Sequence, residues 1–235
     1  DTIKSIGNLA FANANIKSIN ISTNLQHIGG GAFMGCNECA YKIAPNHPIF
    51  TVMDKALYNK KTKELMAFNY YIWPDQWFII PEGILSIGDY AFYDNRSNDM
   101  HISLPSTLEH IGDYAFYGVS FSVESKGFFG NNLISIGDYA FSEDNFKNPK
   151  TGQAYRMEIK LPDSFETLGV GAFASIGNNS VGYTPVSLDI PSGAKLTEIP
   201  DRAFHQAENL FVDVACKINK VGEYAFLAWS AFGFS

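Results

Sequence analysis

Two aspartates are the best candidates in this sequence for acid–base chemistry or cation binding. Asp189 and Asp213 stand at the same offset in two alternating apolar–polar stretches, so paired strands would place them side by side. Two carboxylates about 5 Å apart fit a retaining glycosidase or a cation site. No third acid and no pocket-forming element supports either role. A charged surface row is therefore the favoured interpretation.

The cysteines and histidines provide no stronger candidate. Cys36 and Cys39 have metal-ligand spacing, but no second pair completes a tetrahedral site. Two small side chains in a turn is the favoured interpretation, with a local disulfide or a bound metal as alternatives. The five histidines are scattered, and we find no catalytic-triad order and no phosphate-binding glycine loop. We therefore expect a non-enzymatic protein with no catalytic residues, no metal and no other cofactor.

An internal repeat determines which elements position these residues. The hexapeptide Ile-Gly-Asp-Tyr-Ala-Phe occurs three times, and looser copies follow Ile/Leu/Val-Gly-x-x-Ala-Phe, one with proline in place of glycine. The eight copies lie at 6–11, 28–33, 87–92, 111–116, 136–141, 168–173, 199–204 and 221–226. Recurrence on this scale predicts a solenoid of stacked coils.

Each position of the repeat has a physical role. The glycine permits a tight bend or a close backbone approach. The next residue, often aspartate, can cap a short helical turn, which explains the Asp89, Asp113 and Asp138 series better than a calcium site does. One coil cannot bury its phenylalanine, whereas stacked coils can. We therefore expect the phenylalanines of successive coils to stack on one another.

A second element precedes most copies of the repeat. Residues 100–105, 157–162 and 186–191 alternate apolar and polar positions and end in proline, as a half-buried strand does. These patterns predict a β-dominated α/β leucine-rich-repeat solenoid. Short parallel strands should form one concave face, and short helical turns or irregular segments the other.

The whole chain, 1–235, is predicted to form one solenoid domain, with an irregular insertion at about 41–77. Within that insertion, residues 52–59 and 64–70 flank a polar loop at 60–63 and predict a β-hairpin. Residues 144–152 and 177–180 are predicted surface loops. The apolar residues 227–235 are interpreted as a C-terminal cap or the cut edge of a longer array.

The full pattern Ile-Pro-x-x-Leu-x-x-Ile-Gly-x-x-Ala-Phe resembles the BspA-type leucine-rich repeats of bacterial surface proteins. The resemblance covers nearly the whole chain and implies an exported, cell-surface protein. Residues 54–60 also fit the Asp-x-x-Leu-Tyr-Asn-Lys pattern of such proteins. The chain departs from the repeat at Pro200, at 131–132 and at 215–216, where local irregularity is expected.

Composition excludes several classes of partner. A net charge of −7 argues against nucleic acid, because phosphate contacts need a basic surface. No apolar run is long enough to insert into a membrane. The chain opens in the middle of a repeat and shows no signal peptide, as expected of a processed or trimmed fragment.

Outward-facing strand positions vary between coils and are the candidate partner-binding residues. Aligning the strands on their trailing proline gives two rows, in which Ser120 follows His101 and Ser122 follows Ser103. The candidates drawn from these rows are Trp77, Ile79, His101, Ser103, Glu158, Lys160, Asp189, Phe211 and Asp213. Apolar side chains on such a face are common interface anchors, unless the insertion loops cover them.

The predicted function is binding of a protein partner, such as a host or matrix protein, through the exposed sheet face, with adhesion as the expected role. One alternative is carbohydrate binding, because Tyr70, Tyr71, Trp73 and Trp77 could stack on sugar rings. The other is a structural spacer without a ligand.

Overall fold

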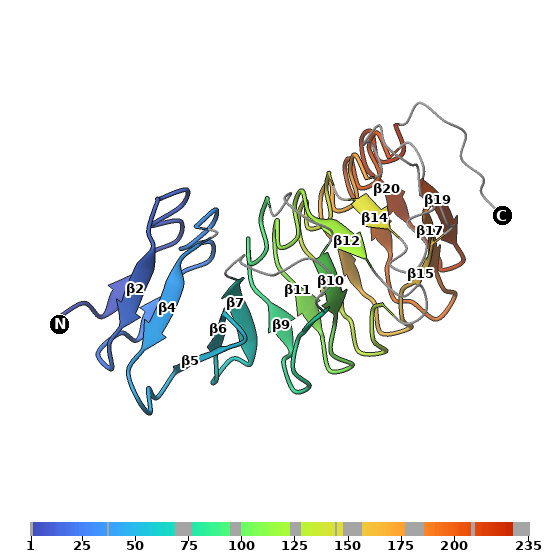
Figure 1. The fold of residues 1–235 in the computed structure, drawn as a ribbon. Coiled ribbons are helices and arrows are strands. Elements are labelled where there is room, and N and C mark those ends of the chain that lie inside the picture. Colours follow the sequence, from blue (N-terminus) through green and yellow to red (C-terminus); the bar gives the residue numbers. More distant parts are fainter. Residues whose placement is uncertain are drawn as a thin grey trace.

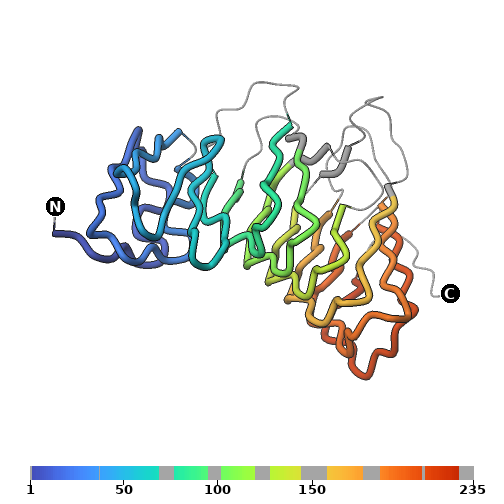
Figure 2. The backbone as a smooth tube through the Cα atoms, turned by 90° about the horizontal axis from the view of Figure 1, so that it is seen from below, coloured from blue at the N-terminus to red at the C-terminus, as the bar shows by residue number. Residues whose placement is uncertain are grey.

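The computed structural model describes residues 2–36, 38–68, 77–94, 100–122, 128–143, 145–147, 157–176, 186–207 and 210–227. Every regular element in these residues is a β-strand. The chain winds into coils that stack from the N-terminus to the C-terminus along a curved path (Figures 1 and 2). A complete coil contains a longer strand, a two-residue strand and a turn segment. The predicted solenoid is therefore confirmed as a β-solenoid.

The longer strands pair in parallel and form three separate sheets, whose outward side we call the long-strand face. Their alternating burial follows the apolar–polar alternation of the sequence, as in β17 and β8. The sheets are β2 (Ser18–Ile21) with β4 (Ala40–Ile43); β8 (Trp77–Ile79), β10 (Met100–Ser103), β12 (Ser120–Ser122) and β14 (Asn145–Lys147); and β15 (Met157–Lys160), β17 (Val186–Ile190) and β19 (Leu210–Val214).

Two-residue strands, whose outward side we call the short-strand face, carry the first residue of each repeat copy. In most of them this aliphatic residue is buried and the residue before it is more exposed. The strands are β1 (Ser5–Ile6), β3 (His27–Ile28), β9 (Ser86–Ile87), β11 (His110–Ile111), β13 (Ser135–Ile136), β16 (Thr167–Leu168), β18 (Glu198–Ile199) and β20 (Lys220–Val221). Proline-led turns connect the longer strands to them; for example, Leu108 N–H donates to Pro105 at 3.1 Å.

The turn segments run from the repeat glycine to the second residue after the repeat phenylalanine. Their N–H groups bond alternately within a coil and between coils. Ala115 donates to the carbonyl of Gly112 in its own coil, whereas Phe116 donates to Ala140 of the next coil at 2.9 Å. The expected helical turns are not observed in the described residues. Half of the donors that a helix would use are engaged between coils.

The repeat glycine provides close approach rather than a bend. A Cβ at Gly112 would lie 2.7 Å from the backbone nitrogen of Asp89 and 2.9 Å from the carbonyl carbon of Gly88, in the preceding coil. The aspartate has a matching role between coils. Asp89 Oδ1 accepts a hydrogen bond from Asp113 N–H at 3.0 Å, and Asp113 Oδ1 accepts one from Asp138 N–H at 2.8 Å. Each aspartate therefore caps the following coil, not a helical turn of its own.

The phenylalanines form the column that the repeat predicts. The ring centroids of Phe92 and Phe116 are 4.9 Å apart, and those of Phe116 and Phe141 are 5.1 Å apart, with near-parallel planes. The column continues through Phe173, Phe204 and Phe226 at separations of 5.2–5.9 Å. The prediction that like side chains stack between coils is confirmed.

The insertion is an antiparallel meander of β5 (Phe50–Met53), β6 (Ala56–Asn59) and β7 (Glu64–Phe68). The predicted hairpin around 60–63 is confirmed between β6 and β7. The single strand expected at 52–59 is wrong, because Asp54 and Lys55 adopt positive φ values of 45° and 67° and form a two-residue turn there. The meander joins the short strands through parallel pairing of β7 with β9.

The meander also divides the hydrophobic core. Leu57 and Ala67 pack in an N-terminal cluster that extends back to Ile6, whereas Tyr58 and Leu65 pack in a larger cluster that extends to Ala225. Figure 1 shows the meander between the two N-terminal coils and the regular array. Its side chains thus line both parts of the core.

Two strands differ from the sequence alignment. In β12, Ser122 rather than Ser120 pairs with His101, a shift of two residues that keeps the same side outward. Within the predicted loop 144–152, residues Asn145–Lys147 form β14 and pair with β12. The rest of that loop, the loop at 177–180 and the tail beyond residue 227 lie outside the described residues.

Turn and coil-to-coil hydrogen bonds are retained where the chain departs from the repeat, although β12, which leads into the coil at 131–132, is shifted by two residues. Ala203 N–H closes the usual turn onto Pro200 at 3.3 Å, and Ala215 N–H donates to Ile190 at 2.9 Å. At the position of the missing proline, the Asn132 side chain donates to the Ser106 carbonyl of the preceding coil at 2.8 Å. The coil-to-coil bonds therefore persist despite these substitutions.

Candidate binding surfaces

The long-strand face carries its candidate residues in two separate groups. Trp77 and Ile79 lie on β8, where 42% and 62% of their surfaces are exposed. Their backbone partners on β10 are His101 and Ser103. Of the His101 side chain the structure gives no description. This first group lies at one edge of the four-stranded sheet, because β8 is its terminal strand.

The second group lies on the three-stranded sheet and is mainly charged. Lys160, Asp189 and Asp213 are aligned on adjacent strands, as predicted, and Lys160 Nζ lies 3.9 Å from Asp189 Oδ2. Glu158 and Phe211 flank Ser187 in the neighbouring row. The two aspartates lie on a solvent-accessible sheet with an ammonium group beside them, as in a charged surface row.

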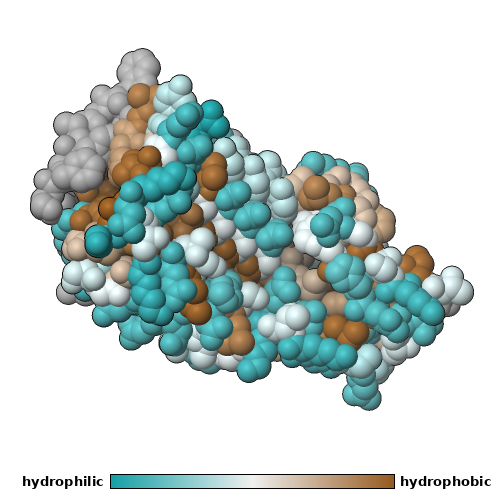
Figure 3. Space-filling view, turned by 180° about the vertical axis from the view of Figure 1, so that it is seen from behind, coloured by the Kyte–Doolittle hydropathy of each residue, from teal (hydrophilic) through white to brown (hydrophobic). Residues whose placement is uncertain are grey.

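Among the side chains that the structure describes, the exposed apolar ones on the long-strand face lie on terminal strands. Phe211 is 46% exposed on β19, which ends its sheet as β8 ends the other. At the corresponding positions of the inner strands β10 and β17 the side chains are polar. Elsewhere, the view from behind shows a largely hydrophilic surface with scattered hydrophobic residues (Figure 3).

A groove of about 550 Å³ runs along the short-strand face. Its acidic lining residues are Glu64, Asp89, Asp113 and Asp138, and its described lining includes no lysine or arginine. Burial raises the pKa of Glu64 and of Asp89, and in each case a neighbouring carboxylate raises it further. Within the described residues no group of three or more potential ligands could hold a metal ion.

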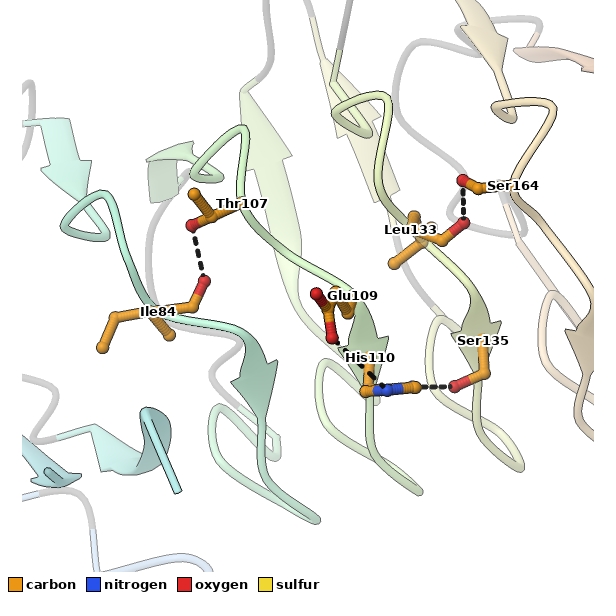
Figure 4. A network of polar contacts seen from close by, with 7 residues as sticks. All are labelled: Ile84, Thr107, Glu109, His110, Leu133, Ser135 and Ser164. Carbon is orange, nitrogen blue, oxygen red and sulfur yellow. Dashed lines mark hydrogen bonds and ion pairs between the residues drawn. The ribbon is translucent and has the colours of Figure 1, made fainter. Parts of the chain in front are cut away.

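One constellation beside this groove resembles a catalytic triad (Figure 4). His110 Nδ1 lies 2.8 Å from Ser135 Oγ, and His110 Nε2 lies 4.0 Å from Glu109 Oε2. The second distance is too long for the hydrogen bond that orients a catalytic base. The N–H groups of Ser135, Gly137 and Asp138 all donate to the preceding coil, so none is available to stabilise an oxyanion. The contact joins two coils.

The other contacts in Figure 4 have the same role. Thr107 Oγ1 donates to the Ile84 carbonyl at 2.8 Å, and Ser164 Oγ donates to the Leu133 carbonyl at 2.7 Å. Each bond joins a proline-led turn to the coil before it. These hydroxyl groups are therefore engaged in holding the array together.

The cysteines are buried free thiols, and Cys36 Sγ lies 2.9 Å from the Phe11 carbonyl. Burial and the nearby Cys36 raise the pKa of Cys39 to about 11. A thiol with a raised pKa is a poor nucleophile and a poor metal ligand at neutral pH. The interpretation of two small side chains in a turn therefore fits the structure.

Sequence reasoning missed a cluster of five tyrosines on the turn segments, which we call the tyrosine patch. It consists of Tyr90, Tyr114 and Tyr139 in one row, and Tyr93 and Tyr117 in a second. Rings within each row stack at centroid distances of 5.1–5.2 Å. The identical hexapeptides were the available signal, but identity between copies was interpreted as scaffold alone.

The wound parallel strands and the phenylalanine column define the class of this protein, a leucine-rich-repeat β-solenoid. The chain belongs to the family of the BspA type leucine rich repeat region: its six-copy model matches residues 1–70, 66–175 and 151–231. No curated protein matches the sequence. No described segment forms a helix of the length and apolar character needed to cross a bilayer.

Three solved structures share the fold. The pneumococcal vaccine antigen PcpA has a TM-score of 0.64 at 18% identity, over 91% of this chain and 54% of that one. A leucine rich cell surface protein of Faecalibacterium prausnitzii has a TM-score of 0.63 at 19% identity, over 97% and 52%. A leucine-rich repeat protein of Eubacterium ventriosum has a TM-score of 0.59 at 17% identity, over 97% and 63%. The chain thus spans about half the length of the first two.

Proposed function

We propose that this chain is a non-enzymatic binding module displayed at the cell surface, which engages a protein partner through the long-strand face and acts in adhesion. The observation that carries the proposal is the exposure of Trp77, Ile79 and Phe211 on terminal strands. Exposed aromatic and aliphatic side chains beside polar neighbours are typical of interface anchors.

The cell-surface location is part of the proposal and is supported by the family and by the F. prausnitzii structure, which is described as a cell surface protein. Terminal strands also suit this role. They carry their exposed apolar side chains at the two ends of the described long-strand sheets.

The test is the double substitution Trp77→Ala/Phe211→Ala in the purified chain. Adherence to a panel of immobilised matrix proteins and glycans is measured by surface plasmon resonance. We expect a protein that binds the wild type to bind the variant at least about tenfold more weakly, as for loss of interface hot spots. The matched control is Val221→Thr, an exposed residue on the short-strand face, which should leave that binding unchanged.

Each other outcome has a defined meaning. Loss of glycan binding alone would overturn the proposal in favour of carbohydrate binding, for which the exposed Trp77 ring is the described candidate. If the variant bound every ligand as the wild type does and its thermal unfolding were unaltered, the interpretation of the chain would be a structural spacer without a ligand. Hydrolysis of any glycan or peptide by the wild type would overturn the non-enzymatic assignment.

A further inference from the structure

The backbone under the tyrosine patch is unfavourable for tyrosine. Tyr90, Tyr114 and Tyr139 have φ values of 58°, 54° and 52°, in the left-handed region where a bulky L-residue is strained. In the second and sixth copies of the repeat, glycine occupies the same position at Gly31 and Gly171. The fold therefore accepts the residue that carries no strain, and it does not require tyrosine there.

Stacking explains part of the choice of tyrosine and leaves each side chain partly exposed. The ring of Tyr90 packs on the Gly31 backbone and that of Tyr139 on Gly171, so that the glycines close both ends of the row. The faces of Tyr114 are covered by its two neighbours. All five tyrosines remain partly exposed at the surface. Such a surface offers hydrogen bonds and apolar contact together.

The electrostatic surroundings of the patch are negative. Asp89, Asp113 and Asp138 each precede a tyrosine of the first row, and they also line the groove of about 550 Å³ on the short-strand face. Burial raises the pKa of Tyr90 and Tyr114, and the carboxylates of this aspartate row raise it further. The described groove lining holds no lysine or arginine, so a cationic side chain of a partner would meet no lysine or arginine there.

We propose that the tyrosine patch and the aspartate row bind an extended, lysine- or arginine-bearing segment of a protein partner. Tyrosine hydroxyls and carboxylates accept hydrogen bonds from guanidinium and ammonium groups, and ring edges pack against their aliphatic stems. The described groove lining comes from six neighbouring strands and turns, from Glu64 to Pro200, and spans about 24 Å at strand spacing, the length of about seven extended residues. Ring faces covered by stacking disfavour a sugar, which would need an open face.

This inference rests on the proposed protein-binding function but uses a different surface, so the two can fail separately. The probe is a fluorescein-labelled dodecapeptide of alternating arginine and serine, and its control replaces each arginine with neutral citrulline. Binding to the purified chain is followed by fluorescence anisotropy. The wild type should bind the arginine peptide at least about tenfold more tightly at low salt, and added salt should reduce that difference.

Two sets of variants separate charge from aromatic surface. The triple substitution Asp89→Asn/Asp113→Asn/Asp138→Asn removes the charge but keeps an Oδ1 acceptor for the next coil, as Asn8 illustrates in the same slot. Tyr90→Gly/Tyr114→Gly removes two of the five rings and introduces the residue found at Gly31 and Gly171. Each set should weaken arginine-peptide binding by about tenfold, and thermal unfolding confirms that each variant is folded.

Equal binding of the arginine and citrulline peptides by the wild type would overturn the proposal. So would unchanged arginine-peptide affinity in the folded aspartate and tyrosine variants, or binding of a neutral glycan that only the tyrosine variant loses. The Trp77→Ala/Phe211→Ala variant should retain wild-type affinity for the arginine peptide. That result distinguishes this surface from the long-strand face.

Discussion

His47 is a single buried residue whose hydrogen bonds hold the chain in place just before the meander. Only 2% of its surface is exposed, and its Nδ1 accepts hydrogen bonds from the N–H groups of Ile49 and Phe50, both at 3.1 Å. Its Nε2 lies 2.9 Å from the Ser22 carbonyl, which it can reach only as a donor. The histidine is therefore a satisfied core residue that joins the second coil to β5.

Removal of this ring should destabilise the fold. His47→Ala leaves two buried N–H groups without an acceptor and opens a cavity, so we expect the free energy of unfolding to fall by about 3 kcal/mol. His47→Asn retains an oxygen acceptor near the position of Nδ1 and should lose clearly less. Urea unfolding followed by circular dichroism measures both changes. Equal losses in the two variants would contradict the assigned role of Nδ1.

For the individual elements, the sequence predicted those features that follow from the pattern repeated in each coil. The phenylalanine column, the Pro-terminated strands and the hairpin around 60–63 follow from local periodicity and turn chemistry. The turn segments did not, because their form depends on partners in the next coil. From the sequence alone, the carboxylate of Asp113 was interpreted as the cap of a helical turn. In the structure it accepts a hydrogen bond from Asp138 N–H in the next coil.

The site was less predictable than the fold for the same reason. Asp189 and Asp213 were correctly paired because residues 210–214 repeat the five-residue apolar–polar alternation of 186–190, although Ala215 replaces the proline. In β12 no proline marks the end, and the rows were offset by two residues. The tyrosine patch depends on stacking across three coils and on positive φ, neither of which a single hexapeptide reveals.

Glycine at the start of the turn segment provides an element-scale prediction. Gly112→Ala would place a methyl group against the Asp89 backbone of the preceding coil, which cannot move without breaking its own bonds. We expect a loss of about 2–4 kcal/mol in the free energy of unfolding. Gly7→Ala is the matched control, because Gly7 holds the same repeat position and has no atom within 4 Å of its Cβ site. Equal effects at both positions, measured by denaturant unfolding, would refute the close-approach role.

For the whole molecule, the divided core predicts unequal stability. The N-terminal cluster is much the smaller of the two, and its coils pair only in two-stranded sheets. The larger cluster runs without interruption from the meander to Ala225. The N-terminal coils should therefore open at a lower free energy than the regular array.

Hydrogen exchange with mass spectrometry in increasing urea tests this expectation. Peptides from residues 2–43 should lose protection at lower urea than peptides from 101–118. The substitution Phe116→Ala removes one ring from the phenylalanine column. We expect it to lower the free energy of opening of the regular array by about 3–5 kcal/mol. The two sets of peptides should then lose protection at more similar urea concentrations. Coincident loss of protection in the unmodified chain would indicate that the meander couples both clusters into one cooperative unit.

Successive coils are joined by the same kind of hydrogen bond, and this affects how such a chain could lengthen during evolution. The Oδ1 atoms of Asp89, Asp113 and Asp138 accept the same hydrogen bond from the next coil, across intervals of 24, 25 and 32 residues. After an in-frame duplication of one interval, the aspartate N–H group of the added coil would find an aspartate Oδ1 acceptor in the coil before it. Duplication of a 24- or 25-residue interval would thus add one coil, with one tyrosine for each row of the tyrosine patch, without redesign of the interior.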